Sequence, residues 1–218
     1  MLKKIRTKSI IGVGKNILIF IIFNIILLLN KWLLRSWNIN LPLVFLSISL
    51  FFIFTMLIFL NNKFLLYLSG VIFLLLCFYQ VKTTNLKYLY SYTPSQIDTQ
   101  IKRVVYYPSE FTRLGYILEY KKETLIFYKI QENFFNMLDP NQYFPDYFFY
   151  SLLPFAVMGL VKFINLKKTF IKLLFITSSG LITILGVNSQ LGPIILFPFI
   201  NLFAFLGFLH IFKLKYSP

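Results

Sequence analysis

One long polar segment, Lys82–Asp146, divides the chain, and it reads KTTNLKYLYSYTPSQIDTQIKRVVYYPSEFTRLGYILEYKKETLIFYKIQENFFNMLDPNQYFPD. It contains every acidic residue of the protein: Asp98, Glu110, Glu119, Glu123, Glu132, Asp139 and Asp146. The regions on either side are strongly apolar and carry Lys and Arg but no carboxylate. Because long apolar runs free of acids are typical of membrane spans, we expect two membrane-embedded regions joined by one extramembranous segment.

The composition indicates a multi-pass membrane protein with the lipid bilayer as its surroundings. Hydrophobic residues make up 58% of the 218-residue chain and charged residues 13%, whereas soluble domains carry about 25% charged residues. The net charge is +15, but the polar segment, with eight basic and seven acidic residues, contributes only +1 of it. The other basic residues flank apolar runs, where they set orientation and contact anionic headgroups. We therefore expect no nucleic-acid partner.

Six apolar runs predict an all-α membrane fold with six transmembrane helices, three on each side of the polar segment. A helix of about 20 residues, rising about 1.5 Å per residue, crosses the roughly 30 Å hydrocarbon core. The predicted spans are Ile17–Leu29, Leu41–Leu60, Phe64–Val81, Tyr147–Ile164, Thr169–Val187 and Ile194–Phe212. The resulting domains are a basic N-terminus (1–16), spans one to three (17–81), a partly helical extracytoplasmic segment (82–146), spans four to six (147–212) and a short tail (213–218).

Basic residues in the short connections predict the orientation. Placing the N-terminus in the cytoplasm puts twelve Lys and Arg residues inside, against only Lys31 and Arg35 on the short outer turn. This distribution obeys the positive-inside rule, so we expect both termini in the cytoplasm and the polar segment outside. The abundance of Phe, Ile, Leu, Lys, Asn and Tyr indicates an AT-rich genome. We therefore expect a bacterial plasma membrane, with an organellar inner membrane as the alternative.

Helical periodicity runs through the polar segment. Thr93 followed by Pro94 is typical of a helix start, and Tyr106–Pro108 ends this first helix. A second helix starts at Ser109–Glu110, and the pattern continues until Asp139–Pro140 stops it. The apolar stripes consist of Ile97, Ile101, Val104, Val105, Phe111, Leu114, Ile117, Leu118, Leu125, Tyr128, Phe134, Phe135 and Leu138. Such stripes can lie on the outer leaflet, pack into a cap over the bundle or bind a soluble partner, and we favour a cap lying partly on lipid.

A series of short motifs crosses from the polar segment into the fourth predicted span. They are, in order, Tyr107-Pro108, Asn133-Phe134-Phe135, Leu138-Asp139-Pro140-Asn141, Tyr143-Phe144, Leu152-Leu153-Pro154-Phe155 and Gly159. Over Arg103–Phe163 the chain thereby resembles the passage from outer loop to span in GT-C-type glycosyltransferase-like multi-pass envelope proteins of small-genome bacteria. The resemblance implies an outer loop that binds a polyprenyl-linked lipid. That class carries an acidic motif in its first outer loop, where Arg35–Asn40 of this chain contains no acid.

Asp139 and Asp146 are the candidate catalytic residues. Asp139 ends a predicted helix before a Tyr- and Phe-rich return to the membrane, where a carboxylate could bind a metal or act as a base toward a lipid-linked substrate. We prefer the alternative that Asp139-Pro140-Asn141 is a helix stop and a turn. Cys77 is the only cysteine and His210 the only histidine, so we expect no disulfide, no cofactor and no metal site.

The sequence favours a non-enzymatic accessory or assembly component of a membrane complex, with membrane proteins as its partners. One alternative is a reduced relative of GT-C-type envelope glycosyltransferases, with a polyprenyl-linked lipid as its substrate. Another is a passive channel or carrier. Coupled transport is disfavoured because no predicted span contains the carboxylate on which such transporters rely.

Overall fold

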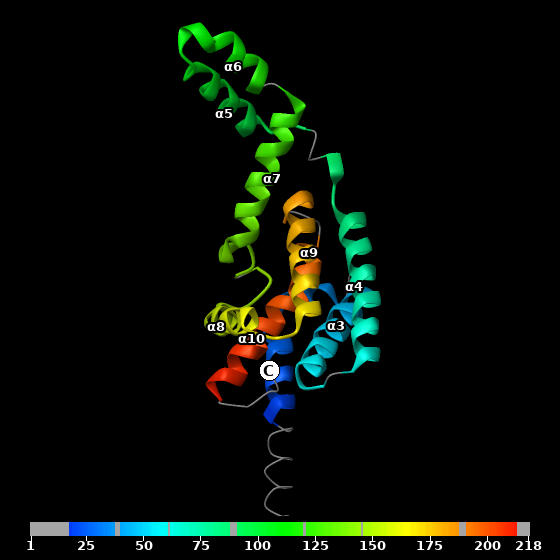
Figure 1. Cartoon of the computed structure of the whole chain (residues 1–218). Helices are drawn as coiled ribbons and strands as arrows, with labels where there is room; N and C mark the ends of the chain where they lie inside the picture. Colours follow the sequence, from blue (N-terminus) through cyan, green and yellow to red (C-terminus); the bar gives the residue numbers. More distant parts are fainter. Residues whose placement is uncertain are drawn as a thin grey trace, which may run out of the picture.

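The computed structural model describes residues 18–37, 40–60, 62–87, 91–119, 121–144, 146–187 and 191–212. All regular structure within these ranges is helical, which confirms the predicted all-α class. Figure 1 shows a bundle of helices and an arm that extends from it. The basic N-terminus (1–16) and the short tail (213–218) predicted from the sequence lie outside the described residues.

Three helices of the bundle are long and apolar enough to cross a membrane, which supports a membrane protein. They are α3 (Leu41–Phe59), α4 (Lys63–Thr83) and the segment Ile194–Ile211, which joins the 3-10 turn η5 (Ile194–Leu196) to α10 (Phe197–Ile211). Helix α3 begins where the Asn40 side chain accepts a hydrogen bond from the amide of Leu43 (3.3 Å). Pro42 lies in its first turn, where an amide proton has no partner within the helix.

Three further apolar helices are shorter. They are the first helix (Leu18–Leu28), the continuous pair of η4 (Tyr150–Leu152) and α8 (Leu153–Ile164), and α9 (Thr169–Leu185). The predicted fourth span begins three residues too early, because residues 146–149 form turns before the helix starts at Tyr150. The structure thus combines three helices of span length with three shorter apolar ones.

A sharp break follows the first helix. Asn30 caps α2 (Lys31–Ser36), since its side-chain oxygen accepts a hydrogen bond from the amide of Leu33 (3.1 Å). The same side chain donates to Oδ1 of Asn201 on α10 over 3.3 Å, and both asparagines are buried. Trp32 adds a bond from its indole N–H to a main-chain carbonyl, that of Leu191 (2.8 Å). Because buried polar groups are costly unless they are paired, these bonds hold α2 against the bundle.

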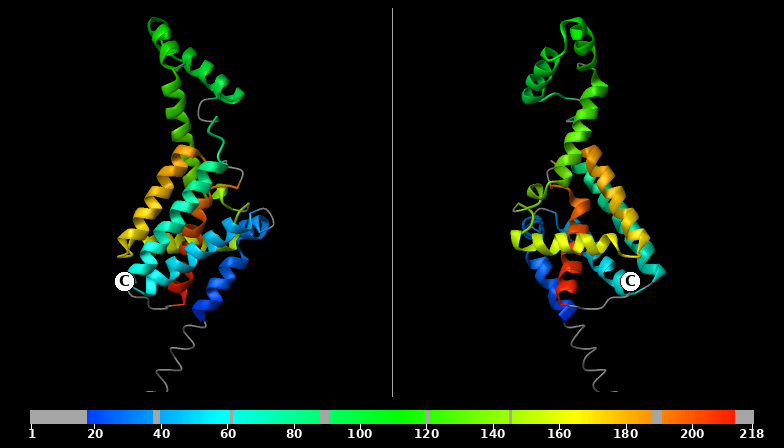
Figure 2. Two further views of the ribbon diagram at one scale, coloured as in Figure 1. Left: turned by 90° about the vertical axis from the view of Figure 1, so that its right-hand side faces the viewer. Right: turned by 60° about the vertical axis from the view of Figure 1, so that its left-hand side comes forward.

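Two glycines bring α8 and α10 into backbone contact. Figure 2 shows α8 running across α10. A Cβ atom on Gly159 would lie 1.6 Å from the carbonyl oxygen of Phe203, and one on Gly207 would lie 2.0 Å from the carbonyl oxygen of Phe155. Only residues that lack a side chain permit this approach, so the two glycines fix the crossing point.

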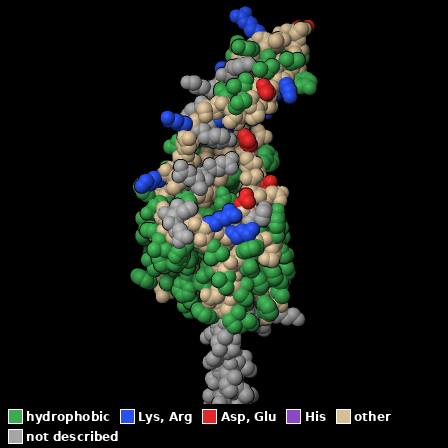
Figure 3. All heavy atoms as spheres, turned by 180° about the vertical axis from the view of Figure 1, so that it is seen from behind, with side chains coloured by type: hydrophobic (Ala, Val, Ile, Leu, Met, Phe, Trp, Pro, Cys, Tyr) green, Lys and Arg blue, Asp and Glu red, His purple; other side chains and the backbone are tan. Residues whose placement is uncertain are grey.

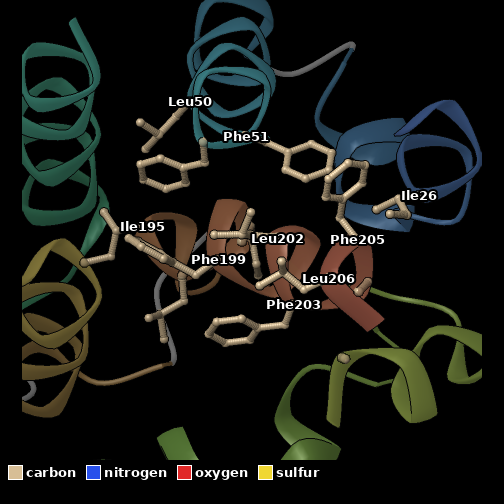
Figure 4. Close-up of a cluster of buried hydrophobic side chains, with 14 of the residues drawn as sticks. Ile26, Leu50, Phe51, Ile195, Phe199, Leu202, Phe203, Phe205 and Leu206 are labelled. Atoms are coloured by element: carbon tan, nitrogen blue, oxygen red, sulfur yellow. The ribbon is translucent and has the colours of Figure 1, made fainter. Parts of the chain in front are cut away.

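Helix α10 forms the centre of the hydrophobic core. Figure 4 shows Phe199, Leu202 and Phe205 of α10 gathered with Leu50 and Phe51 of α3. The rings of Phe51 and Phe205 meet edge to face, with their centroids 6.2 Å apart, which is a favoured arrangement of aromatic pairs. Most residues of α10 are buried on all sides, and the other apolar helices pack around it.

The sequence predicted one helix from Thr93–Pro94 and one continuous pattern from Ser109 to Asp139, whereas the arm consists of three helices. They are α5 (Pro94–Val105), α6 (Thr112–Glu119), which follows the 3-10 turn η2 (Ser109–Phe111), and α7 (Lys122–Leu138). Thr93 and Gln96 form a capping box at the start of α5. Figure 1 places α5 and α6 at the end of α7 that is farthest from the bundle. The arm therefore extends beyond the bundle and does not form the cap that we favoured from the sequence.

The C-terminal half of α7 packs against α9 and thereby connects the arm to the bundle. The hydroxyl of Thr183 on α9 lies 3.8 Å from the sulfur of Met137 on α7. The side chain of Asn133 lies where a Cβ on Gly186, the residue that ends α9, would meet it at 3.0 Å. Figure 3 shows hydrophobic side chains covering the bundle, while Lys, Arg, Asp and Glu gather on the arm and at its junction with the bundle.

Candidate functional site

The arm has polar side chains between its helices and apolar side chains on its outside. Gln100 of α5, Glu119 of α6 and Lys129 of α7 are 5%, 4% and 0% exposed. Val105 and Tyr106, at the end of α5, are 75% and 87% exposed. The stripes predicted for α5 and α6 are present, but they face outward: Ile97, Ile101, Val105, Phe111, Leu114, Ile117 and Leu118 are all exposed.

Glu119 connects the three arm helices through polar contacts. The side-chain amide of Gln100 donates to its main-chain carbonyl over 2.8 Å. The guanidinium of Arg103 on α5 lies 3.7 Å from its carboxylate, and the hydroxyl of Tyr128 on α7 donates to that carboxylate over 3.4 Å. Arg103 also lies over the ring of Tyr128, 3.8 Å from the centroid. The buried carboxylate therefore has both a cation and a hydrogen-bond donor beside it, as a buried charge requires.

Lys129 ties α7 to the segment that precedes α5. Its ammonium group donates a hydrogen bond to the main-chain carbonyl of Ser91. Burial lowers the pKa of this lysine from its ordinary value of 10.5, and the nearby Glu132 opposes that decrease. The arm thus holds a lysine whose charged form is disfavoured by its surroundings.

A groove of about 650 Å³ runs between α5 and α7. Its lining includes Tyr92, Ser95, Gln96, Thr99, Gln100, Arg103, Leu125, Tyr128, Lys129, Gln131, Glu132 and Phe135. The amide of Gln96 donates to the carboxylate of Glu132 over 3.4 Å. Arg103 is paired with Glu119, and Lys129 lies one helical turn from Glu132, so the charges balance. A groove of this size, mixed lining and balanced charge suits an uncharged or zwitterionic ligand.

The two candidate acids have separate surroundings outside this groove. One carboxylate oxygen of Asp139 accepts hydrogen bonds from the main-chain amide and the side-chain amide of Asn141, over 2.9 and 3.0 Å. Asp139 thereby caps the 3-10 turn η3 (Pro140–Gln142). Asp146 is exposed, and its main-chain carbonyl accepts a hydrogen bond from Arg35 (3.2 Å). The structure thus places Asp139 in a turn and Asp146 beside the short helix α2.

A second, apolar groove of about 190 Å³ opens beside Asp139. Leu138 and Pro140, the neighbours of Asp139 in the chain, both line it. The rest of the lining comes from Met137, Tyr143, Phe144, Leu153, Ala156, Val157, Leu160, Phe175, Ser179, Leu196, Ile200 and Phe203. Its walls are therefore the foot of the arm and the helices α8, α9 and α10.

The remaining polar residues singled out in the sequence stand apart from both grooves. His210 is exposed near the end of α10, and Cys77 is half-buried in α4. Within the described ranges, no group of three or more His, Cys, Asp or Glu residues is placed to hold a metal ion.

Sequence reasoning missed the residues of the arm interior: Gln100, Arg103, Glu119, Tyr128 (taken as part of an apolar stripe) and Lys129. One pattern could have indicated Lys129. Leu125, Lys129 and Asn133 recur every fourth residue of α7, and all three are buried. A stripe at this spacing lies on one helix face, so it predicts that Lys129 and Asn133 share the environment of Leu125.

Comparison with models of protein families, with curated proteins and with solved structures finds no match to this chain. The resemblance of Arg103–Phe163 to GT-C-type envelope proteins therefore stays a prediction from the sequence.

Proposed function

We propose that this chain is a non-enzymatic accessory or assembly component of a membrane complex, and that its arm binds a partner protein of that complex. The observation that carries this proposal is the outward-facing apolar surface of the arm, including Val105, Tyr106 and Phe127. Large exposed apolar patches are uncommon on solitary proteins and mark interaction sites. Aromatic residues such as Tyr and Phe are enriched in protein interfaces.

The proposal includes the membrane topology expected from the sequence. Three apolar helices precede the arm and three follow it, and the positive-inside rule supports an extracytoplasmic arm with both termini in the cytoplasm of a bacterium. Helices α8 and α9 are shorter than a full span, so they form either two spans in a locally thinned bilayer or one re-entrant hairpin. Both arrangements return the chain to the side of the arm, so both leave the C-terminus inside.

Site-specific photo-crosslinking in the native membrane tests the partner directly. A photoreactive amino acid at Tyr106, on the outer face, should crosslink to one defined protein. The same amino acid at Gln100, inside the arm, should crosslink only within the chain, because Gln100 is buried against Glu119. Crosslinks to lipid alone from Tyr106 would contradict a protein partner and would favour an arm that lies on a membrane.

A second candidate function is the binding of a lipid-linked glycan, as a reduced relative of GT-C-type envelope proteins. The arm groove favours it, because a side-chain amide such as that of Gln131, which is exposed in the lining, can both donate to and accept from sugar hydroxyls. A purified lipid-linked oligosaccharide should then bind the wild-type chain and bind the Gln131→Ala variant more weakly. Equal binding by both would exclude the groove as the site.

A further inference from the structure

We propose that the apolar groove beside Asp139 holds an acyl chain of a bilayer phospholipid, and that the Asp139 carboxylate binds the primary ammonium group of that lipid. The site would take an aminophospholipid of the phosphatidylethanolamine type. This inference is independent of the proposed partner of the arm, because it uses the opposite end of α7 and the helices α8 to α10.

The groove has the position and size for one stretch of hydrocarbon chain. A methylene group occupies about the volume of a water molecule, roughly 30 Å³. The groove volume of about 190 Å³ therefore accommodates a stretch of about six methylene groups. Val157 and Leu160 of α8 belong to its lining and are exposed on the outside of the bundle. Because its inner wall belongs to the span-length segment Ile194–Ile211, we expect the groove to face lipid chains in a membrane.

The apolar walls cannot by themselves select a lipid. Hydrocarbon tails are as apolar as leucine side chains, so moving a tail from the bilayer into such a groove brings no hydrophobic gain. Selectivity has to come from a polar group near the opening. Among the lining residues, which include no Lys or Arg, none carries a charge that would attract the phosphate.

Asp139 supplies the polar group. It is not itself part of the lining but lies between Leu138 and Pro140, which both are, and it directly follows the end of α7 that meets the bundle in Figure 1. Within the described part of the chain, the hydrogen bonds from Asn141 both fall on Oδ1, which leaves Oδ2 for a ligand. A carboxylate in this position is complementary to an ammonium group with N–H donors, and charge-assisted hydrogen bonds of this kind are the strong ones. A choline headgroup has the charge but no donor.

Native mass spectrometry of the purified full-length chain tests the assignment. The protein is equilibrated with equal amounts of phosphatidylethanolamine, phosphatidylcholine and phosphatidylglycerol that carry identical acyl chains. We expect wild type to retain phosphatidylethanolamine over phosphatidylcholine by about tenfold, the effect of one charge-assisted hydrogen bond. Asp139→Asn keeps an Oδ1 that accepts both bonds from Asn141, so the fold should persist while the preference falls to about equal retention.

Two further variants locate the site. Asp146→Asn removes the other candidate acid and should leave the preference unchanged. Ser179→Leu fills the groove and should reduce the retention of phosphatidylethanolamine and phosphatidylcholine alike. An unchanged preference in Asp139→Asn, or a loss of preference in Asp146→Asn, would overturn the assignment.

A series of headgroups tests the same claim without any mutation. Replacing phosphatidylethanolamine by its monomethyl, dimethyl and trimethyl derivatives removes the N–H donors one at a time. Retention by the wild-type chain should fall with each methyl group. Equal retention across the series, or the strongest retention of phosphatidylglycerol, would contradict binding of the ammonium group by Asp139.

Discussion

The side-chain amide of Gln100 donates a hydrogen bond to the main-chain carbonyl of Glu119 over 2.8 Å, in the buried interior of the arm. The two residues join α5 to α6 through polar groups, while apolar residues such as Ile101 and Leu114 stay on the outside. Amphipathic helices in water normally turn their apolar faces toward each other. The arm has the reverse arrangement, and this exposed apolar face supports the proposed binding of a partner protein.

The hydrogen bond of Gln100 can be removed with a small change. Gln100→Ala leaves the carbonyl of Glu119 buried without that donor, which costs about 1–3 kcal/mol. We expect the main-chain amides of α5 and α6 to exchange faster with solvent by the factor that corresponds to this free energy. Exchange of the α10 amides should stay unchanged. Gln131 is an exposed glutamine of the same groove. Its replacement in Gln131→Ala should change the free energy of opening, measured by hydrogen exchange, by less than about 0.5 kcal/mol. Equal effects of the two variants would show that the interior bond does not hold the arm.

The crossing of α8 and α10 should be intolerant of any side chain. Gly159→Ala places a methyl group 1.6 Å from the carbonyl oxygen of Phe203. Because this obstacle is main chain, we expect destabilisation at or above about 3 kcal/mol, the upper end for overpacked cores. Gly180→Ala on α9 meets no atom within 4 Å and should be neutral or slightly stabilising. Thermal unfolding in detergent measures both, and similar melting temperatures for the two variants would rule out this crossing.

Lys129 gives the arm a dependence on pH. Its pKa is lowered in the folded arm, so the unfolded chain binds the proton more tightly. The contribution of Lys129 to stability is therefore lowest at neutral pH and rises as pH increases from the folded pKa toward 10.5. Proteolysis of the opened arm between pH 7 and 10 should show the wild-type chain gaining stability relative to Lys129→Met. A difference that is constant or falls with pH would contradict this sign.

Cysteine labelling tests the topology in intact cells. In a Cys77→Ser background, Thr99→Cys on the arm should react with a membrane-impermeant maleimide, and Lys215→Cys in the tail should react only after permeabilisation. Lys167→Cys, in the turn between α8 and α9, distinguishes the two arrangements of these helices. It should be labelled from the inside if both cross, and protected from both sides if they form a re-entrant hairpin.

The helices of this protein could be predicted from the sequence, but the side that each buries could not. Local patterns define a helix: Thr93 and Pro94 start α5, and Asp139 with Pro140 ends α7. Burial depends on neighbours that are distant in the chain, such as Glu119 for Gln100. The periodicity of α5 therefore predicted its apolar stripe correctly and its packing wrongly.

The same distinction applies to the bundle. Hydropathy located all six apolar segments, because each is a continuous run of apolar residues. It placed the end of the first run at Leu29 but could not predict the short helix α2 that follows, since the cap residue Asn30 bonds to Asn201 on the last helix. Hydropathy also could not predict how α8 crosses α10, because the crossing depends on the close approach of Gly159 to the main chain of Phe203.

The central claim is that the outer face of the arm binds a partner protein, and affinity capture from native membranes in mild detergent tests it most directly. The arm-face variant combines Val105→Ser, Tyr106→Ser and Phe127→Ser. The control combines Lys102→Ser, Glu123→Ser and Gln131→Ser, exposed polar residues of the same helices. We predict one stoichiometric membrane partner with wild type and control, and its loss with the arm-face variant. A partner retained equally by all three, or no partner with wild type, would contradict the account.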